Sequence, residues 1–215
     1  MNIFYCISTV ATAFLMSTLS AYFICSYNNY PFINPSLTDE EQNLKINEYI
    51  KNVPILIIQS TSLMYLISDN IIKYDDPDTL RVYRMASDHT LFQSFYTLCI
   101  YFLCIEAIYY VYHRLIHKYF YLYVHKKHHT NITVYPFDTF FLTELDDFAS
   151  IVSIGLPVVF IKISMIEQFI ILYIYITSSY LSHSNLFWNH HYIHHKLFKY
   201  NFCILFPIFD IIFGT

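Results

Sequence analysis

The chain contains little glycine and little charge. Only 2 of its 215 residues are glycine, and 13% are charged, whereas an ordinary soluble protein carries about 25% charged residues. The shortage of glycine argues against a loop-rich β protein, and the shortage of charge argues against an ordinary water-soluble one. The formal net charge is −4 and no basic patch occurs, which excludes nucleic acid as an expected partner.

Cysteine pairing is also absent from the pattern. The chain has five cysteines, an odd number, and none of them forms a C-x-x-C pair. Four of the five lie in apolar runs, so a disulfide framework is not expected. We predict buried free thiols.

Long apolar stretches are abundant, since 56% of the residues are hydrophobic. Stretches near twenty residues are typical of membrane helices, and there are five candidates: Ile3–Cys25, Val53–Ile72, Leu91–Tyr112, Phe148–Ile163 and Met165–Trp188. The first lacks a preceding basic region, which favours a retained anchor over a signal peptide. Residues 28–52 and 73–89 hold proline, asparagine and charge, and are predicted to be loops.

The fourth stretch is short for a membrane span. Its sixteen residues would rise about 24 Å as a helix, less than the roughly 30 Å of a hydrocarbon core. It also contains Gly155 and Pro157. We therefore expect one arm of a tight helical hairpin, within an all-α integral membrane protein of four to five transmembrane helices.

Basic residues suggest which side of the membrane each loop occupies. If five spans alternate, residues 28–52, 113–147 and the tail after 188 share one face. That face would hold eight Lys and Arg residues, against four on the other. The excess predicts a cytoplasmic location for the first face, and all the histidine motifs described next fall on it.

Histidine is concentrated in the C-terminal half. Ten of the 11 histidines lie between positions 113 and 195, and only His89 stands apart. They include the motifs H-x-x-x-H, H-x-x-H-H and H-x-x-H-H, formed by His113 and His117, by His125, His128 and His129, and by His191, His194 and His195. Residues three or four apart share one face of a helix, so the imidazoles of a motif can reach a common metal.

Eight imidazoles exceed the needs of one metal ion. A structural zinc takes four protein ligands, so eight neutral nitrogen donors predict two ions. Imidazole binds iron, zinc, copper and nickel, and the ligand set alone does not select among them. His183 is a possible ninth ligand, and His190 is interpreted as a neighbour of the ligands or a surface residue. His89 is interpreted as a satisfied polar group in an apolar helix.

Acidic residues near the motifs could accept hydrogen bonds from ring N–H groups and so fix each tautomer. Of the four candidates, Glu106 and Asp146 are favoured, together with His190, as residues that support the ligands. Glu106 lies inside the end of a span, where an acid needs a partner. Asp138 is interpreted as an interfacial charge, and Glu144 is the fourth candidate.

Three segments resemble the fatty acid hydroxylase/sterol desaturase superfamily, and within it most closely the sterol C-5 desaturases (Δ7-sterol 5(6)-desaturases). Glu106–His117 is similar to the segment that ends in H-R-x-x-H, and Tyr121–His129 is similar to Y-x-x-x-H-K-x-H-H. His190–Phe202 resembles the H-H-T-x-H-H-x-x-F-x-Y-N-Y segment of the C-5 desaturases. The resemblance extends from Glu106 to Thr215, about half of the chain.

Shorter matches and departures concern which subgroup of the superfamily the chain resembles. Pro136-Phe137 stands where C-5 desaturases carry Pro-Phe, but Thr143–Asp146 replaces their His-Pro and acidic residue. Cys203 replaces a glycine, and Phe209 replaces the tryptophan before Asp210. The closing Phe-Gly-Thr also occurs in sterol C-4 methyl oxidases.

The resemblance implies a di-iron site that uses O2, with zinc possible in the purified protein, and electrons from NAD(P)H through cytochrome b5 and its reductase. It implies a membrane lipid as substrate, a histidine site facing the cytoplasm, and location in the endoplasmic reticulum. Residues 1–90 would be membrane-anchor helices and loops, and residues 91–215 the catalytic region of one structural unit. The leading expectation is introduction of the C5–C6 double bond into a Δ7-sterol. Alternatives are sterol C-4 methyl oxidation, fatty acid hydroxylation, and a non-catalytic metal-binding membrane protein.

Overall fold

The computed structural model describes residues 3–67 and 89–215, and in these ranges all regular structure is helical. The all-α prediction is therefore confirmed for the described part of the chain. The α-helices are α1 (Ile3–Tyr27), α2 (Asp39–Leu66), α3 (Leu91–Leu115), α4 (Glu144–Gly155), α5 (Met165–Ser182), α6 (His190–Leu197) and α7 (Ile208–Phe213). A π-helix, η3 (Ile116–His125), continues α3, and the short 3₁₀ segments are η4 (His128–Thr130), η5 (Pro136–Phe140) and η6 (Leu156–Val159).

Local sequence explains where three long helices begin. The hydroxyls of Thr38, Thr90 and Ser164 each accept the backbone N–H three residues on, at the starts of α2, α3 and α5. The side-chain oxygen of a Glu or Gln at that third position accepts the backbone N–H of the capping residue. Each capping box satisfies N–H groups that a helix start leaves unpaired.

Helix α2 starts earlier than the sequence reading predicted. Residues 28–52 were expected to form a loop, but the helix begins at Asp39 and continues through Pro54. The physical reason is the capping box at Thr38 and Glu41, a local signal strong enough to start a helix in polar sequence. The predicted span Val53–Ile72 ends beyond residue 67, so its last part lies outside the described residues.

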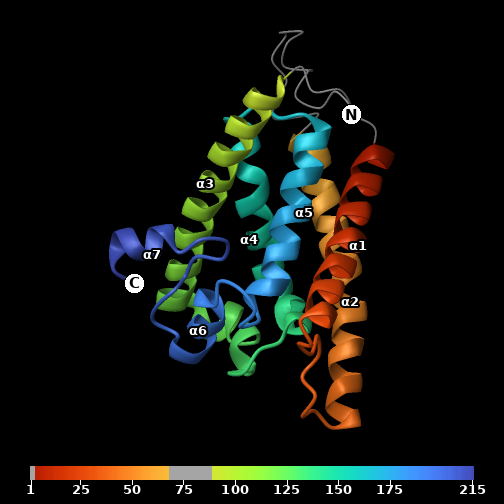
Figure 1. Ribbon diagram of the computed structural model, residues 1–215, viewed down its shortest axis with the longest axis vertical. Coiled ribbons are helices and arrows are strands. Elements are labelled where there is room, and N and C mark those ends of the chain that lie inside the picture. Colours follow the sequence, from red (N-terminus) through yellow and green to blue (C-terminus); the bar gives the residue numbers. More distant parts are fainter. Residues whose placement is uncertain (1–2, 68–88) are drawn as a thin grey trace.

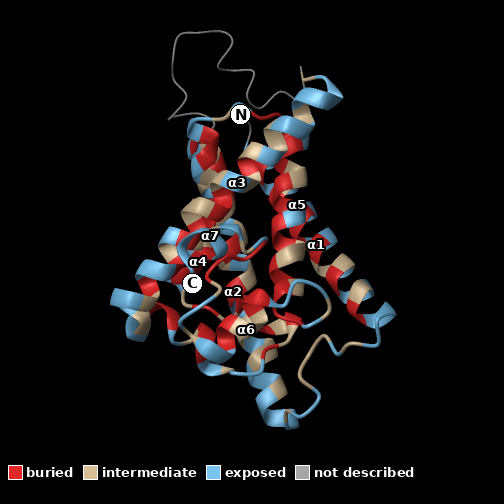
Figure 2. Cartoon of the chain, turned by 60° about the vertical axis from the view of Figure 1, so that its left-hand side comes forward, coloured by how far each residue is buried: buried red, intermediate tan, exposed pale blue. Residues whose placement is uncertain are grey.

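The long helices lie side by side around one core (Figure 1). Helix α1 packs along α5, where the Ser17 hydroxyl donates to the Tyr173 carbonyl at 3.0 Å. The predicted short arm of a hairpin forms α4 and η6, which turn back into α5. Close packing is visible at Gly155, where an added Cβ would lie 2.9 Å from the Leu63 side chain. Buried residues line the inner sides of the helices and exposed residues the outer sides (Figure 2).

Within residues 3–67 and 89–215, two helical segments are long and apolar enough to cross a membrane: Ile3–Tyr27 and Leu91–His125. Large hydrophobic side chains stand on their outer surfaces, including Phe4 at 74% exposed and Phe92 at 78%. Such exposed apolar surface is unusual in water and is compatible with contact with lipid.

The cysteine prediction holds only in part. None of the five cysteines, all of which lie in the described residues, forms a disulfide, and Cys6, Cys25 and Cys203 are buried. Cys99 is exposed on α3. Burial of that thiol was a wrong expectation, because an apolar run on a helix does not say which face points outward.

Candidate metal centre

The nine predicted histidine ligands come together at one end of the bundle, where the end of α3, η3, η4, the end of α5 and α6 meet (Figure 1). Eight of the nine are buried, and His117 is half-buried. They divide into two groups, and within each group the potential ligand atoms all lie within 4.8 Å of one another. The first group is His113, His117, His125, His129 and His194; the second group is His128, His183, His191 and His195.

These groups cut across the sequence motifs. His125 and His129 belong to the first group, whereas His128 belongs to the second. In α6, His191 and His195 are four residues apart and share the second group, while His194 points to the first. Each H-x-x-H-H motif therefore contributes to both groups and joins them.

The second motif also differs from its predicted conformation. His125 ends the π-helix, and His128 and His129 follow a turn into η4, so this motif does not form one face of a single helix. The π-helix is a rare form that occurs often at functional sites. It carries His125 to a position where its Nε2 lies 3.0 Å from Nε2 of His113.

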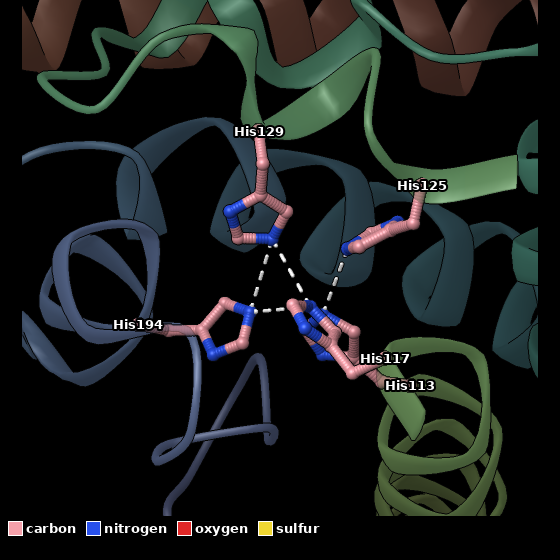
Figure 3. Close-up of side chains that lie close together, drawn as sticks. All are labelled: His113, His117, His125, His129 and His194. Atoms are coloured by element: carbon pink, nitrogen blue, oxygen red, sulfur yellow. Dashed lines mark hydrogen bonds between the residues drawn. The ribbon is translucent and has the colours of Figure 1, made fainter. Parts of the chain in front are cut away.

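The first group points its Nε2 atoms at one another from three chain segments (Figure 3). Nε2 of His194 lies 3.0 Å from Nε2 of His117 and 3.1 Å from that of His129. His117 and His129 are themselves 3.1 Å apart at Nε2. At a metal–nitrogen distance of about 2.1 Å, two ligands at right angles lie about 3.0 Å apart. The spacing therefore fits a shared metal ion.

The outward-facing nitrogens fix the tautomers. Nδ1 of His113 lies 2.7 Å from the Phe202 carbonyl, and Nδ1 of His125 lies 2.7 Å from Oδ2 of Asp146. Both oxygens accept, so in the neutral rings Nδ1 carries the proton and Nε2 carries a lone pair. The facing Nε2 atoms of His113 and His125 then have no proton to share, and a cation between them resolves the repulsion.

His194 follows the same rule. Its Nδ1 donates to the Tyr200 carbonyl at 2.7 Å, which leaves its Nε2 as an acceptor toward the first group. Metal-bound histidines ordinarily have such an oxygen behind the other ring nitrogen. Backbone carbonyls of the segment after α6 therefore orient two of the five rings.

The second group has the same character. Nδ1 of His183 lies 2.8 Å from the Ser179 carbonyl, and its Nε2 lies 3.2 Å from Nε2 of His128. Among the described residues, neither ring nitrogen of His191 or His195 has a hydrogen-bond partner. Buried polar atoms are nearly always paired, so these four nitrogens indicate a missing partner such as a metal ion. His183 thus lies among the potential ligands of the second group.

Burial favours the neutral form of His129, His191 and His195. Loss of solvation, followed by the neighbouring imidazoles, lowers the pKa values of His191 and His195 well below 6.5. The pKa of His129 is lowered for the same reasons. A neutral ring has a free lone pair, which is the form that binds metal.

The predicted supporting residues have different environments. Asp146 accepts from His125 on one oxygen and from the Tyr112 hydroxyl, at 2.5 Å, on the other. Glu106 does not contact a histidine: its carboxylate accepts the backbone N–H of Leu205 at 2.9 Å, with longer bonds from Ile204 and Phe206. It instead holds the segment that follows the third motif.

His190, His89 and Asp138 lie outside the two histidine groups. His190 is buried at the start of α6 but lies outside both groups. His89 lies outside them too, with its Nδ1 2.8 Å from Glu167. Asp138 is not an interfacial charge: it is buried, paired with Lys45, and accepts the Tyr135 backbone N–H at 2.9 Å.

Sequence reasoning did not identify Tyr112 or Asp147. Tyr112 directly precedes His113, and Asp147 directly follows Asp146. Position beside a motif is the only signal that could have suggested them, because their contacts depend on how α4 packs against α3.

An apolar cavity of about 70 Å³ adjoins both groups. His125 of the first group and His128 and His183 of the second are among its lining residues, and most of the others come from α1, α2, α4 and α5. A second cavity of about 30 Å³ shares Ile151, Ile154 and three other lining residues with it and continues to Gly155 and Val158. The arrangement can hold metal ions beside a narrow apolar space.

Comparison with known proteins identifies the family. Residues 98–215, more than half of the chain, match the fatty acid hydroxylase family. No curated protein and no solved structure matches the chain significantly. The matched region contains every histidine of both groups. With two helices that could span a membrane and histidine groups that could bind metal, the chain belongs to the fatty acid hydroxylase family of membrane-bound lipid hydroxylase and desaturase-type oxidoreductases.

Proposed function

We propose that this protein is an O2-dependent di-iron oxidoreductase that introduces the C5–C6 double bond into a Δ7-sterol. The observation that carries the oxidative part is the convergence of two buried histidine groups beside an apolar cavity. The sterol part rests on the resemblance of His190–Phe202 to the corresponding segment of sterol C-5 desaturases.

Each histidine group would hold one ion. The first group would contribute five imidazoles and the second group four. Bound iron would supply the oxidation of an unactivated C–H bond, which no ordinary side chain performs. The chain itself orients the rings through Asp146 and the carbonyls of Ser179, Tyr200 and Phe202, and excludes water by burial.

The membrane arrangement follows from the same proposal. The histidine-bearing elements lie at one end of the bundle (Figure 1), and the excess of Lys and Arg in the corresponding loops favours the cytoplasmic side of the endoplasmic reticulum. There, cytochrome b5 and its reductase would deliver electrons from NAD(P)H. Residues 91–215 would form the catalytic region, and residues 1–90 would anchor it and complete the cavity wall through Val10 and Leu56.

Acyl-chain hydroxylation is the second candidate, because the family match is to fatty acid hydroxylases. Sterol C-4 methyl oxidation is a further variant, supported by the Phe-Gly-Thr ending. A non-catalytic zinc-binding role would use the same ligands without lipid turnover.

The deciding experiment is expression in a host that lacks sterol C-5 desaturase, followed by mass spectrometry of its sterols and acyl lipids. Restored 5,6-unsaturation supports the lead, new 2-hydroxy acyl chains support hydroxylation, and newly oxidised C-4 methyl groups support the third alternative. His195→Ala should abolish the product, and His89→Gln, outside both groups, should not. Unchanged lipids with two bound metal ions per purified chain would indicate the non-catalytic role.

A further inference from the structure

Asp147 is a buried acid without a visible partner. The residue is 1% exposed, and among the described residues neither carboxyl oxygen has a hydrogen-bond partner. Its neighbour Asp146 is equally buried but pairs with His125 and Tyr112. Burying a polar group without a hydrogen bond is unfavourable, so Asp147 indicates a group that is supplied from outside the chain.

The cavity beside the histidines is where that group would lie. Asp147 lines it together with the half-buried Ser60 and Ser150, next to His125 and His128. Asp147 belongs to neither histidine group. A role as a direct metal ligand therefore does not explain the position of Asp147 in the cavity lining.

Polar residues are concentrated in the lining of the first cavity, which includes Asp147, Asp146 and three histidines. Along α4, Gly155 is eight residues after Asp147, a rise of about 12 Å. The second cavity reaches Gly155, and its lining is apolar, with residues such as Ile154 and Val158, except for Ser60 and Gln168. An amphipathic lipid placed here would put its polar group at Asp147 and its apolar body toward Gly155.

The chemistry of the site selects a hydroxyl group. A hydroxyl both donates and accepts, so it pairs with a carboxyl group in either protonation state. A cationic headgroup is disfavoured because two metal ions would occupy the adjacent histidine groups. An unsubstituted hydrocarbon chain would leave Asp147 unpaired.

We propose that Asp147 recognises a hydroxyl group of the lipid substrate, and that the substrate is a hydroxyl-bearing lipid oxidised within a few carbons of that hydroxyl. This inference rests on the proposed function and adds the residue that determines specificity. A sterol that carries a 3-hydroxyl and is oxidised at C5 satisfies it, and an acyl chain oxidised far from any polar group does not.

The test compares lipids that differ only in one hydroxyl. Metal-loaded protein in nanodiscs is titrated with cholest-7-en-3β-ol against cholest-7-ene, and with octadecan-1-ol against octadecane, and thermal stabilisation reports binding. In at least one pair, the wild type should bind the hydroxyl-bearing member at least tenfold more tightly. Asp147→Leu should remove that preference, and Glu144→Gln, which removes an exposed acid from the same helical turn, should retain it.

Folding and metal loading are checked in the same samples. Asp147→Leu should keep two metal ions per chain, and its lipid-free melting temperature should be unchanged or higher, since a buried unpaired acid is removed. A hydroxyl preference that survives in Asp147→Leu overturns the inference, as does a wild type without preference in either pair. If Asp147→Leu loses its metal or melts lower, the residue has a structural role and the inference is wrong. Failure of the proposed function appears separately, as a wild type that binds lipid with this preference but oxidises none.

Discussion

The contact between Asp146 and His125 offers a sharp test of the metal centre. Asp146 is 1% exposed and accepts two hydrogen bonds, one from His125 Nδ1 at 2.7 Å and one from the Tyr112 hydroxyl at 2.5 Å. In Asp146→Asn, one acceptor oxygen becomes an NH2 donor. Either the His125 N–H faces the new donor, or the Tyr112 hydroxyl accepts from it and its own proton loses its acceptor; a buried donor left unpaired costs about 1–3 kcal/mol.

The expected consequence is weaker binding of the ion in the first group. Loss of the oxygen behind a metal-bound histidine typically lowers metal affinity about 10- to 100-fold. Competition with a chromophoric chelator measures that affinity directly in purified protein. The ion of the second group should be held as before, because His183 is oriented by Ser179 instead.

A second substitution supplies the control. Adding Tyr112→Phe to Asp146→Asn removes the competing hydroxyl, so the amide oxygen can turn to His125. The double variant should recover part of the lost affinity, whereas a general packing defect would make it worse. If Asp146→Asn binds both ions with wild-type affinity, the orienting role of Asp146 is refuted.

Three further predictions concern the same region. His117→Ala should lower metal content from two ions toward one per chain and abolish lipid oxidation, as measured by elemental analysis and product assay; equal metal content would argue against His117 as a ligand. In the metal-free protein, stability should fall as pH drops below about 6.5, because burial depresses the folded-state pKa of His191 and His195 and the unfolded chain therefore takes up protons first. The slope should not exceed about 1.4 kcal/mol per pH unit for each histidine, and thermal unfolding at pH 7.5 and 5.5 checks it. Glu106→Ala should cost about 2–4 kcal/mol of unfolding free energy by leaving the N–H groups of residues 204–206 unpaired; a denaturation midpoint equal to that of the wild type would contradict this.

Much of the fold could be anticipated from local patterns. Long apolar runs predicted α1 and α3, and Gly155 with Pro157 predicted the short arm that becomes α4 and η6. The start of α2 was missed, although its capping box is visible at Thr38 and Glu41. The loop was predicted from the polar composition of residues 28–52, and the capping box was overlooked. Because that signal is local, the error does not reflect tertiary packing.

The partners of individual side chains could not be anticipated. Glu106 was expected to face a histidine but holds backbone N–H groups about a hundred residues later. Asp138 was expected at an interface but is buried against Lys45. Such pairings depend on which segments meet, and the sequence around each residue does not contain that information.

The sequence by itself predicted the helical class and, through residue type and short-range spacing, the eight motif histidines as candidate donors, with His183 as a possible ninth. Only the tertiary structure sorted nine imidazoles into groups of five and four. That sorting splits both H-x-x-H-H motifs, since adjacent residues of a helical turn point in different directions and their neighbours come from distant segments. The tertiary structure likewise decided that Asp146 is paired and Asp147 is not. Both acids line the cavity, but the packing of α4 brings only Asp146 within hydrogen-bond distance of His125 and Tyr112.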